Sequence, residues 1–170
     1  MTRSPSHPHA TVAQCRIATP LGALTLEASA LGLSAARFDA QAHHPGASAA
    51  PVDPEQPHLA RAAREFAEYF AGQRRQFTVA LDPQGTPFQQ RVWQALLAIP
   101  WGALSSYGRI AGELGLPRAA RAVGAAVGRN PVAVIVPCHR VVGADGSLTG
   151  YAGGLPRKTA LLQLEGALLT

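Results

Sequence analysis

The sequence of 170 residues predicts an α+β protein, with an α/β N-terminal half and a mainly α C-terminal half. Three observations support this prediction. Residues 16–38 alternate apolar with small or polar side chains, as half-buried strands do. Beyond residue 86, apolar side chains recur instead at helical spacing. Between the two patterns lies the turn sequence Asp82-Pro83-Gln84-Gly85, where we expect the domain boundary.

The N-terminal half is expected to contain a β-meander or hairpin, then a helix, then one more strand. Residues 16–38 would form the meander, and the spacing of apolar side chains predicts a helix over residues 59–72. Residues 76–81 have the composition of a strand. Residues 1–14 contain several Pro, Ser and His residues, and we expect them to form a disordered tail. The N-terminal domain would then span residues 15–85.

Helices dominate the C-terminal half, which we expect to form a domain over residues 86–170. Apolar spacing predicts a helix over residues 88–99. Ser106 is the expected N-cap of a short second helix, and residues 118–128 would form a third. Because a Gly-containing turn joins the second and third helices, we predict a helix-turn-helix. A final amphipathic helix is expected over residues 155–169.

The third of these helices combines very small residues with arginines. Small side chains let a helix backbone approach a ligand closely, but they also allow close packing against the core, and the pattern leaves both interpretations open. The small residues are Ala119, Ala120, Ala122, Gly124, Ala125 and Ala126, and the arginines are Arg118, Arg121 and Arg129.

A thiol lies beside an imidazole after an apolar run. Residues 132–136 are apolar and mostly β-branched, which predicts a strand buried on both faces and ended by Pro137. Cys138 follows directly. A thiol becomes a nucleophile when a base or a positive charge stabilises its thiolate, and His139 and Arg140 offer both. A lone cysteine is often only a buried apolar residue, but this setting favours a catalytic thiol.

Glu165 is the expected partner of the imidazole. Adjacent side chains of an extended chain point to opposite faces, so we expect His139 to act on Cys138 through a bridging water. Such a relay needs a carboxylate that orients the imidazole. The C-terminal half contains only three acids. Asp145 lies in a turn and Glu113 on an expected surface helix, which leaves Glu165.

The positive charge is confined to the C-terminal half. Residues 1–85 contain seven Arg and seven acids, whereas residues 86–170 contain seven Arg, one Lys and three acids, so the net charge of +5 comes from the second half. A basic half is typical of proteins that bind polyanions such as nucleic acids, although charge alone is weak support.

The two cysteines are far apart in the sequence, which indicates neither a disulfide framework nor a close-spaced metal pair. A catalytic thiol implies a reducing compartment, so we expect a cytoplasmic protein. The first residues lack the apolar segment of a secretory signal, and no apolar run is long enough to span a bilayer, so no membrane association is expected.

Five short motifs carry a resemblance to a known family. They are Ser106-Tyr107, Arg121-Ala122-Val123-Gly124, Arg129-Asn130-Pro131, Pro137-Cys138-His139-Arg140-Val141-Val142 and Gly150-Tyr151-Ala152-Gly153-Gly154. Together they resemble the bacterial type of O6-alkylguanine-DNA alkyltransferase, and the similarity is continuous over residues 88–166. The resemblance implies a ribonuclease-H-like N-terminal domain and a C-terminal alkyltransferase domain. It also implies DNA repair by one irreversible transfer of an alkyl group from O6-alkylguanine to the protein, with O4-alkylthymine left open as a second substrate.

The resemblance assigns catalytic roles to five residues. Cys138 would accept the alkyl group, with His139 as the base that acts through a water and Glu165 as the carboxylate that orients it. The contacts of Asn130 would hold the site in shape. Tyr107 would donate a hydrogen bond toward N3 of the guanine and so help it leave.

Further residues would bind the substrate. By the resemblance, the backbone N–H of Ala152 donates to O6, and the carbonyls of Cys138 and Val141 accept from the exocyclic amine. Tyr151 and Arg140 are further candidates. Arg121 would fill the base stack after the lesion is flipped out. The helix that enters the minor groove would contact DNA through Arg118, Ala119, Ala120, Arg121, Gly124 and Arg129.

The resemblance implies a reaction without a metal or other cofactor. Eukaryotic relatives carry zinc ligands, a set that Cys15 alone cannot reproduce, so we expect Cys15 to be a buried structural residue. The expected partner is double-stranded DNA containing alkylated guanine, bound by a monomer near the nucleoid, with cooperativity left open.

Two alternative functions remain. One is a lesion-binding protein without transfer, although such relatives replace the cysteine; the other is a cysteine hydrolase, which would turn over repeatedly.

Overall fold

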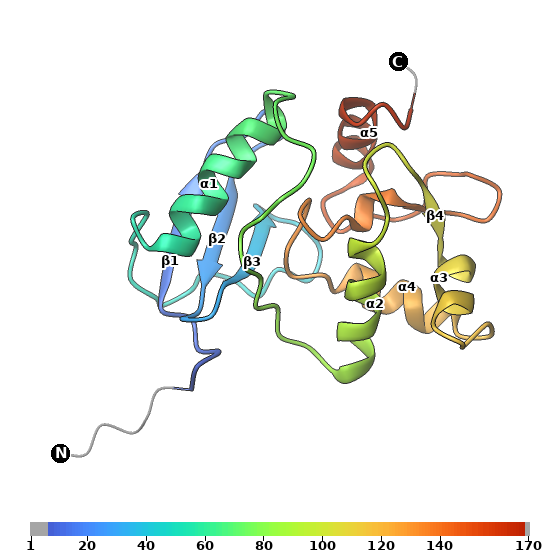
Figure 1. Cartoon of the computed structure of the whole chain (residues 1–170), viewed down its shortest axis with the longest axis horizontal. Coiled ribbons are helices and arrows are strands. Elements are labelled where there is room, and N and C mark those ends of the chain that lie inside the picture. Colours follow the sequence, from blue (N-terminus) through green and yellow to red (C-terminus); the bar gives the residue numbers. More distant parts are fainter. Residues whose placement is uncertain (1–6, 169–170) are drawn as a thin grey trace.

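The computed structural model describes residues 7–168 and shows two halves side by side (Figure 1). A small sheet covered by one helix forms the N-terminal half, and helices form most of the C-terminal half. The α+β architecture predicted from the sequence is therefore confirmed.

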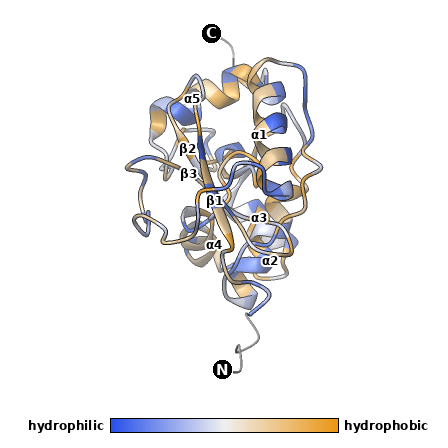
Figure 2. Cartoon of the chain, turned by 90° about the vertical axis from the view of Figure 1, so that its left-hand side faces the viewer, coloured by the Kyte–Doolittle hydropathy of each residue, from blue (hydrophilic) through white to orange (hydrophobic). Residues whose placement is uncertain are grey.

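The N-terminal sheet is a three-stranded antiparallel meander. Strands β1 (Ala13–Ile17), β2 (Leu24–Ala28) and β3 (Leu33–Phe38) pair in the order β1-β2-β3. Helix α1 (Pro57–Phe70) begins with a proline, and the side chain of Gln56 caps its first turn. In Figure 2, α1 shows both hydrophilic and hydrophobic residues along its length, as expected for a helix with one face against the sheet. The meander and the helix were both predicted.

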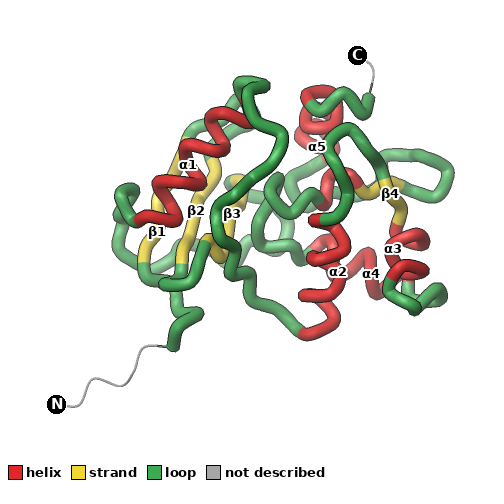
Figure 3. Tube along the Cα trace, viewed as in Figure 1, coloured by secondary structure: helices red, strands yellow, loops and turns green. Residues whose placement is uncertain are grey.

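The predicted strand over residues 76–81 is wrong. Most of this segment is an irregular loop, and only Leu81 forms an isolated bridge with Leu33. The backbone N–H groups of Thr78 and Val79 donate to the carboxylate of Glu65 on α1, at 2.8 and 3.0 Å. A buried side chain thus takes the place of a neighbouring strand. Figure 3 draws the whole connection between α1 and α2 as loop.

Residues 7–14 do not behave as the predicted tail. Ala13 and Gln14 belong to β1, and Nδ1 of His9 lies 2.8 Å from Oδ1 of Asp82. The chain from residue 7 onward is therefore attached to the protein, while residues 1–6 of the predicted tail lie outside the described residues.

The C-terminal half contains the predicted helices with shifted ends. Helix α2 (Pro87–Leu97) starts with a capping box between Thr86 and Gln89. Ser106 caps α3 (Tyr107–Glu113), as predicted, and a turn at Gly115 leads to α4 (Ala120–Gly128). Helix α4 starts two residues later than predicted, because Leu116 to Ala119 form a turn closed by their own backbone. Helix α5 (Leu155–Leu164) ends before Glu165, which forms its C-cap.

The predicted strand over residues 132–136 is also wrong. The segment is buried, but it is a compact turn in which Val134 has a φ of 72° and only Val132 makes a β-bridge. A short 3₁₀ helix follows (Cys138–Arg140), and then β5 (Val141–Val142), which pairs in parallel with β4 (Ser105–Ser106). The burial of residues 132–136 explains their apolar composition. Because the backbone turns there, it cannot form the hydrogen-bond ladder of a strand.

This turn also joins the two halves. The N–H of Ala36 in β3 donates to the carbonyl of Pro131 at 2.9 Å, and the N–H of Ala133 donates back to Ala36 at 2.9 Å. One continuous hydrophobic core extends through both halves. The segment that carries Cys138 is therefore held against the N-terminal sheet.

Candidate active site

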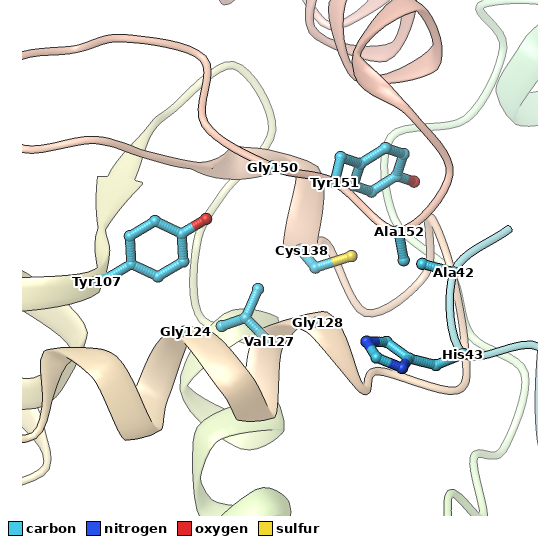
Figure 4. A pocket seen from close by; sticks show the side chains of 10 residues that line it. All are labelled: Ala42, His43, Tyr107, Gly124, Val127, Gly128, Cys138, Gly150, Tyr151 and Ala152. Atoms are coloured by element: carbon cyan, nitrogen blue, oxygen red, sulfur yellow. The ribbon is translucent and has the colours of Figure 1, made fainter.

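A pocket of about 290 Å³ lies beside Cys138 (Figure 4). Segments that are distant in the sequence form its walls: a loop after β3, helices α3 and α4, and the loop before α5. The lining residues are Ala42, His43, Tyr107, Gly124, Val127, Gly128, Cys138, Gly150, Tyr151 and Ala152. The pocket is thus built mainly by the C-terminal half and closed on one side by the N-terminal half.

Cys138 occupies the first position of the 3₁₀ helix and is only 6% exposed. Burial raises the pKa of its thiol, and a hydrogen bond with Asn130 and the charge of Lys158 oppose this shift only in part. The thiol is therefore protonated before reaction. A base must remove its proton for the sulfur to become a strong nucleophile.

His139 is a suitable base. Its ring is fully buried, and Nε2 lies 2.9 Å from Oε2 of Glu165. Burial lowers the pKa of His139, and the neighbouring Glu165 opposes the shift without cancelling it. A neutral ring that donates its Nε2–H to a carboxylate has an acceptor lone pair on Nδ1. This Nδ1 atom is buried and has no hydrogen-bond partner within residues 7–168.

Glu165 is 3% exposed and is surrounded by donors. Burial alone would raise its pKa, but hydrogen bonds from His139, Arg140 and Tyr69 outweigh burial and lower the pKa to about 2. Glu165 therefore stays ionised at neutral pH. Its negative charge stabilises an imidazolium on His139 whenever that ring takes up a proton.

Arg140 belongs to this carboxylate cluster and does not line the pocket. Its Nε donates to Oε1 of Glu165 at 2.8 Å, its Nη2 to Oε2 at 3.0 Å, and its Nη1 to the carbonyl of Ile99 at 2.6 Å. The guanidinium is therefore used to fix Glu165. The expectation that Arg140 binds the substrate is corrected accordingly.

Asn130 holds the turn that precedes Cys138. Its Nδ2 donates to the carbonyl of Val136 at 2.8 Å, and its Oδ1 accepts from the N–H of Val132 at 2.9 Å. The amide thus spans the turn and supplies both a donor and an acceptor to its backbone. This agrees with the site-holding role expected from the sequence.

Tyr107, Tyr151 and Ala152 lie around the pocket as the resemblance implied (Figure 4). The hydroxyl of Tyr107 accepts from Oγ1 of Thr149 at 3.2 Å. Val141 is fully buried and does not line the pocket, and its carbonyl already accepts from Nζ of Lys158 at 2.6 Å. Because a carbonyl oxygen has two lone pairs, it retains one further acceptor position.

The arginines on α4 and on either side of it lie in solvent. Arg118, Arg121 and Arg129 are exposed, whereas Val123 and Ala126 pack into the core. The small residues differ in their surroundings. Ala126 is buried, Ala122 and Ala125 are exposed, Ala119 and Ala120 are partly exposed, and Gly124 lines the pocket.

Sequence reasoning missed three contributors to the site. Lys158 is fully buried, and its Nζ donates to the carbonyls of Val141 and Thr149 at 2.6 and 2.8 Å. It is the one lysine in the sequence, whereas every other residue with a fixed positive charge is an arginine. This exception could have drawn attention to Lys158. His43 and Tyr69 reach the site from the N-terminal half, and no local pattern marks them.

Cys15 lies in β1 and is buried in the hydrophobic core, as expected for a structural residue. Within residues 7–168, no group of three or more His, Cys, Asp or Glu side chains is arranged to hold a metal ion. No helix among the described residues has the length and apolar character needed to cross a membrane.

Comparison with known families finds two matches that together cover most of the chain. Residues 15–83 match the ribonuclease-like domain of 6-O-methylguanine DNA methyltransferase, and residues 87–167 match the DNA binding domain of the same family.

Individual relatives give the same result. The chain is 51% identical over 149 residues to a methylated-DNA–protein-cysteine methyltransferase of Mycobacterium tuberculosis, covering 88% of this chain and 89% of the relative. It is 57% identical over 106 residues to the corresponding protein of Salmonella typhimurium, covering 62% of each chain. A crystal structure of M. tuberculosis OGT in complex with DNA superposes with a TM-score of 0.85 and 49% identity, covering 92% of this chain and 94% of the other.

Proposed function

This chain belongs to the 6-O-methylguanine DNA methyltransferase family, and we propose that it repairs DNA by moving an alkyl group from O6 of guanine onto the sulfur of Cys138. The observation that carries this proposal is the placement of the Cys138 thiol on the pocket, next in the chain to His139, whose buried ring pairs with Glu165. The function requires a thiol that is protected from solvent, accessible to a flipped base and supplied with a base of its own.

The proton of the thiol leaves first. Nδ1 of neutral His139 takes it from Sγ through a bridging water, and the ionised Glu165 stabilises the imidazolium that forms. The charge of Lys158 favours the thiolate that remains on Cys138. A neutral thiol and a neutral imidazole are thereby converted into an ion pair only when the reaction needs one.

The thiolate then displaces guanine at the alkyl carbon. A C–S bond forms as the C–O6 bond breaks, and the electron pair of the broken bond leaves with the guanine. The phenol of Tyr107 donates toward N3 and so stabilises the charge on the leaving base. The product is a thioether, which water does not cleave at neutral pH, so each molecule reacts once.

DNA is the partner of the C-terminal half. The small residues of α4 and the exposed arginines on and beside it suit a helix that lies close to the DNA backbone, with Arg121 entering the stack in place of the flipped base. Residues 15–85 would form the ribonuclease-like domain and residues 86–170 the alkyltransferase domain. We further propose that the protein acts as a cytoplasmic monomer on alkylated DNA.

Counting transferred groups tests the proposal. Incubation with an excess of duplex oligonucleotide that contains O6-methylguanine should transfer methyl groups until each protein molecule carries one. A cysteine hydrolase would instead keep consuming its substrate without retaining a group, and a lesion-binding protein would bind the duplex without consuming the lesion.

A further inference from the structure

A side chain of the N-terminal half reaches the catalytic carboxylate. Tyr69 lies near the end of α1, and its Oη donates to Oε2 of Glu165 at 2.6 Å. Figure 1 shows α1 in the N-terminal half and α5, which precedes Glu165, in the C-terminal half. The two residues are 96 positions apart, so this contact exists only in the folded two-domain protein.

The phenol is fixed and always a donor. Tyr69 is fully buried, and its ring packs against Phe70, Phe77 and Trp101 at centroid distances of 5.1, 5.4 and 5.6 Å. Burial, followed by the negative charge of Glu165, raises the pKa of Tyr69 far above its usual range. Its hydroxyl therefore keeps its proton around neutral pH and can donate to Glu165.

Three donors converge on one oxygen of Glu165. Oε2 accepts from Tyr69 at 2.6 Å, from His139 at 2.9 Å and from Arg140 at 3.0 Å. Each donor stabilises the ionised form and makes the carboxylate a weaker proton acceptor. The Tyr69 contact is the shortest of the three, and it also restrains rotation of the carboxylate plane that faces His139.

We propose that Tyr69 is a positioning residue for alkyl transfer: its hydroxyl holds Glu165 ionised and aimed at His139, so that chemistry in the C-terminal half depends on a side chain of the N-terminal half. This inference rests on the proposed function of Cys138. It gives the ribonuclease-like domain a part in the chemistry of the thiol that acts through Glu165 and His139.

The direction of the effect follows from the groups around the relay. The charged or titratable side chains that face His139 and Glu165 are Arg140 from the 3₁₀ helix, Lys158 from α5, Cys138, Tyr151 and Tyr69 itself. A Tyr69→Phe variant keeps all of them except the phenol. Glu165 then has one donor fewer, so its carboxylate becomes more basic and favours the imidazolium of His139, while the plane of the carboxylate is no longer held toward the ring. The pKa of His139 should therefore rise.

The experiment measures the transfer rate of Tyr69→Phe between about pH 5 and pH 9, a range that spans the ordinary pKa of histidine. Two substrates are used, a free O6-alkylated guanine base and a duplex with O6-methylguanine. Because the carboxylate is no longer held toward His139, we expect transfer at neutral pH to fall about 3- to 10-fold on both substrates. Because the pKa of His139 rises, the acid limb of the profile should move up by roughly half a pH unit or more. DNA affinity should not change, because Tyr69 is fully buried in the core.

Phe77→Leu is the matched control. It loosens the same aromatic cluster without touching Glu165. If Tyr69→Phe only lowers the melting temperature and leaves the pH profile like that of Phe77→Leu, the role of Tyr69 is structural and the inference is wrong. An unchanged rate, or an acid limb that moves to lower pH, would also overturn it.

Cys138→Ala, measured in the same series, separates this inference from the function on which it rests. Retained transfer by Cys138→Ala would refute the proposed function, whatever Tyr69→Phe does. Loss of transfer in Cys138→Ala together with an unchanged profile in Tyr69→Phe would refute the role of Tyr69 alone.

Discussion

Replacing Glu165 with glutamine removes one negative charge while nearly keeping the size of the side chain. The carboxylate accepts four hydrogen bonds, from Tyr69, from His139 and twice from Arg140. A glutamine amide offers only one acceptor oxygen, so whichever way it is oriented its NH₂ group faces a donor. The buried guanidinium of Arg140 also loses its counter-ion.

The Glu165→Gln variant should be less stable than the wild type and should transfer the alkyl group more slowly. Removing one partner of a buried ion pair costs about 3 to 5 kcal/mol, which for a chain of this size corresponds to a melting temperature lower by roughly 10 °C. Transfer should slow by about 10²-fold or more, because the imidazolium on His139 loses its supporting charge. DNA affinity should remain close to that of the wild type, since Glu165 is buried and does not reach the surface that would contact DNA.

The pH dependence of the stability difference has a definite sign. The pKa of Glu165 falls from 4.5 to about 2 on folding, so ionised Glu165 stabilises the folded protein fully above about pH 4.5. That contribution disappears as the pH falls through about 2. The wild type and the Glu165→Gln variant should therefore approach each other in stability across this interval.

Single-turnover transfer, thermal melting and oligonucleotide binding are the assays, with Glu113→Gln as control. Glu113 is exposed and pairs only with Arg109 one turn away on α3, so its loss should cost no more than about 0.5 kcal/mol and leave transfer unchanged. The assignment of Glu165 as the orienting group is refuted if its variant transfers as fast as the wild type. It is equally refuted if the main defect is in DNA affinity.

Three further substitutions test other parts of the site. Arg121→Ala should impair repair of duplex DNA much more than reaction with a free alkylated guanine base, because the guanidinium replaces the flipped base and does not touch the alkyl carbon; equal loss on both substrates would place Arg121 in the chemistry or the fold. Lys158→Met removes the cation that favours the thiolate of Cys138, so transfer at neutral pH should slow by about tenfold and recover partly at higher pH. A pH profile identical to that of the wild type would exclude this role. Asn130→Ala leaves two buried backbone groups of the turn without partners, at a cost of about 2 to 4 kcal/mol, and an unchanged melting temperature would show that the turn does not depend on the amide.

The catalytic candidates could be predicted from the sequence for two reasons. The thiol and the imidazole are neighbours in the chain, and few acidic residues are available to pair with the imidazole. Cys138 and His139 are adjacent, and the C-terminal half contains only three acids, of which two had local explanations. Glu165 therefore remained as the partner of His139, and the 2.9 Å contact confirms that pairing. Helix caps such as Ser106 were equally local, and the structure confirms them.

The two wrong strands have a common cause. Residues 132–136 are apolar and buried, and residues 76–81 alternate exposed with partly or fully buried side chains, so both resemble strands in sequence. In each segment, however, several backbone groups bond to a side chain, that of Glu65 or Asn130, and only an isolated bridge to β3 forms. The spacing of apolar residues indicates which side chains are buried. It cannot reveal that a distant side chain will bond to the backbone.

The missed residues are those brought in by tertiary structure. Tyr69 and His43 reach the site from the N-terminal half, and nothing in the neighbouring sequence distinguishes Tyr69 from other aromatic core residues of α1. Arg140 was named as a candidate for binding the substrate. The 3₁₀ helix turns its guanidinium toward Glu165 instead.

Locating the transferred group by mass spectrometry tests the central claim most directly. The protein would be incubated with a duplex that contains O6-methylguanine, digested, and its two cysteine-containing peptides compared. The account predicts that the peptide with Cys138 gains the mass of one CH₂ unit, that the peptide with Cys15 is unchanged, and that uptake stops at one methyl group per chain. A methyl group on any other residue, or loss of the lesion without a modified protein, would contradict it.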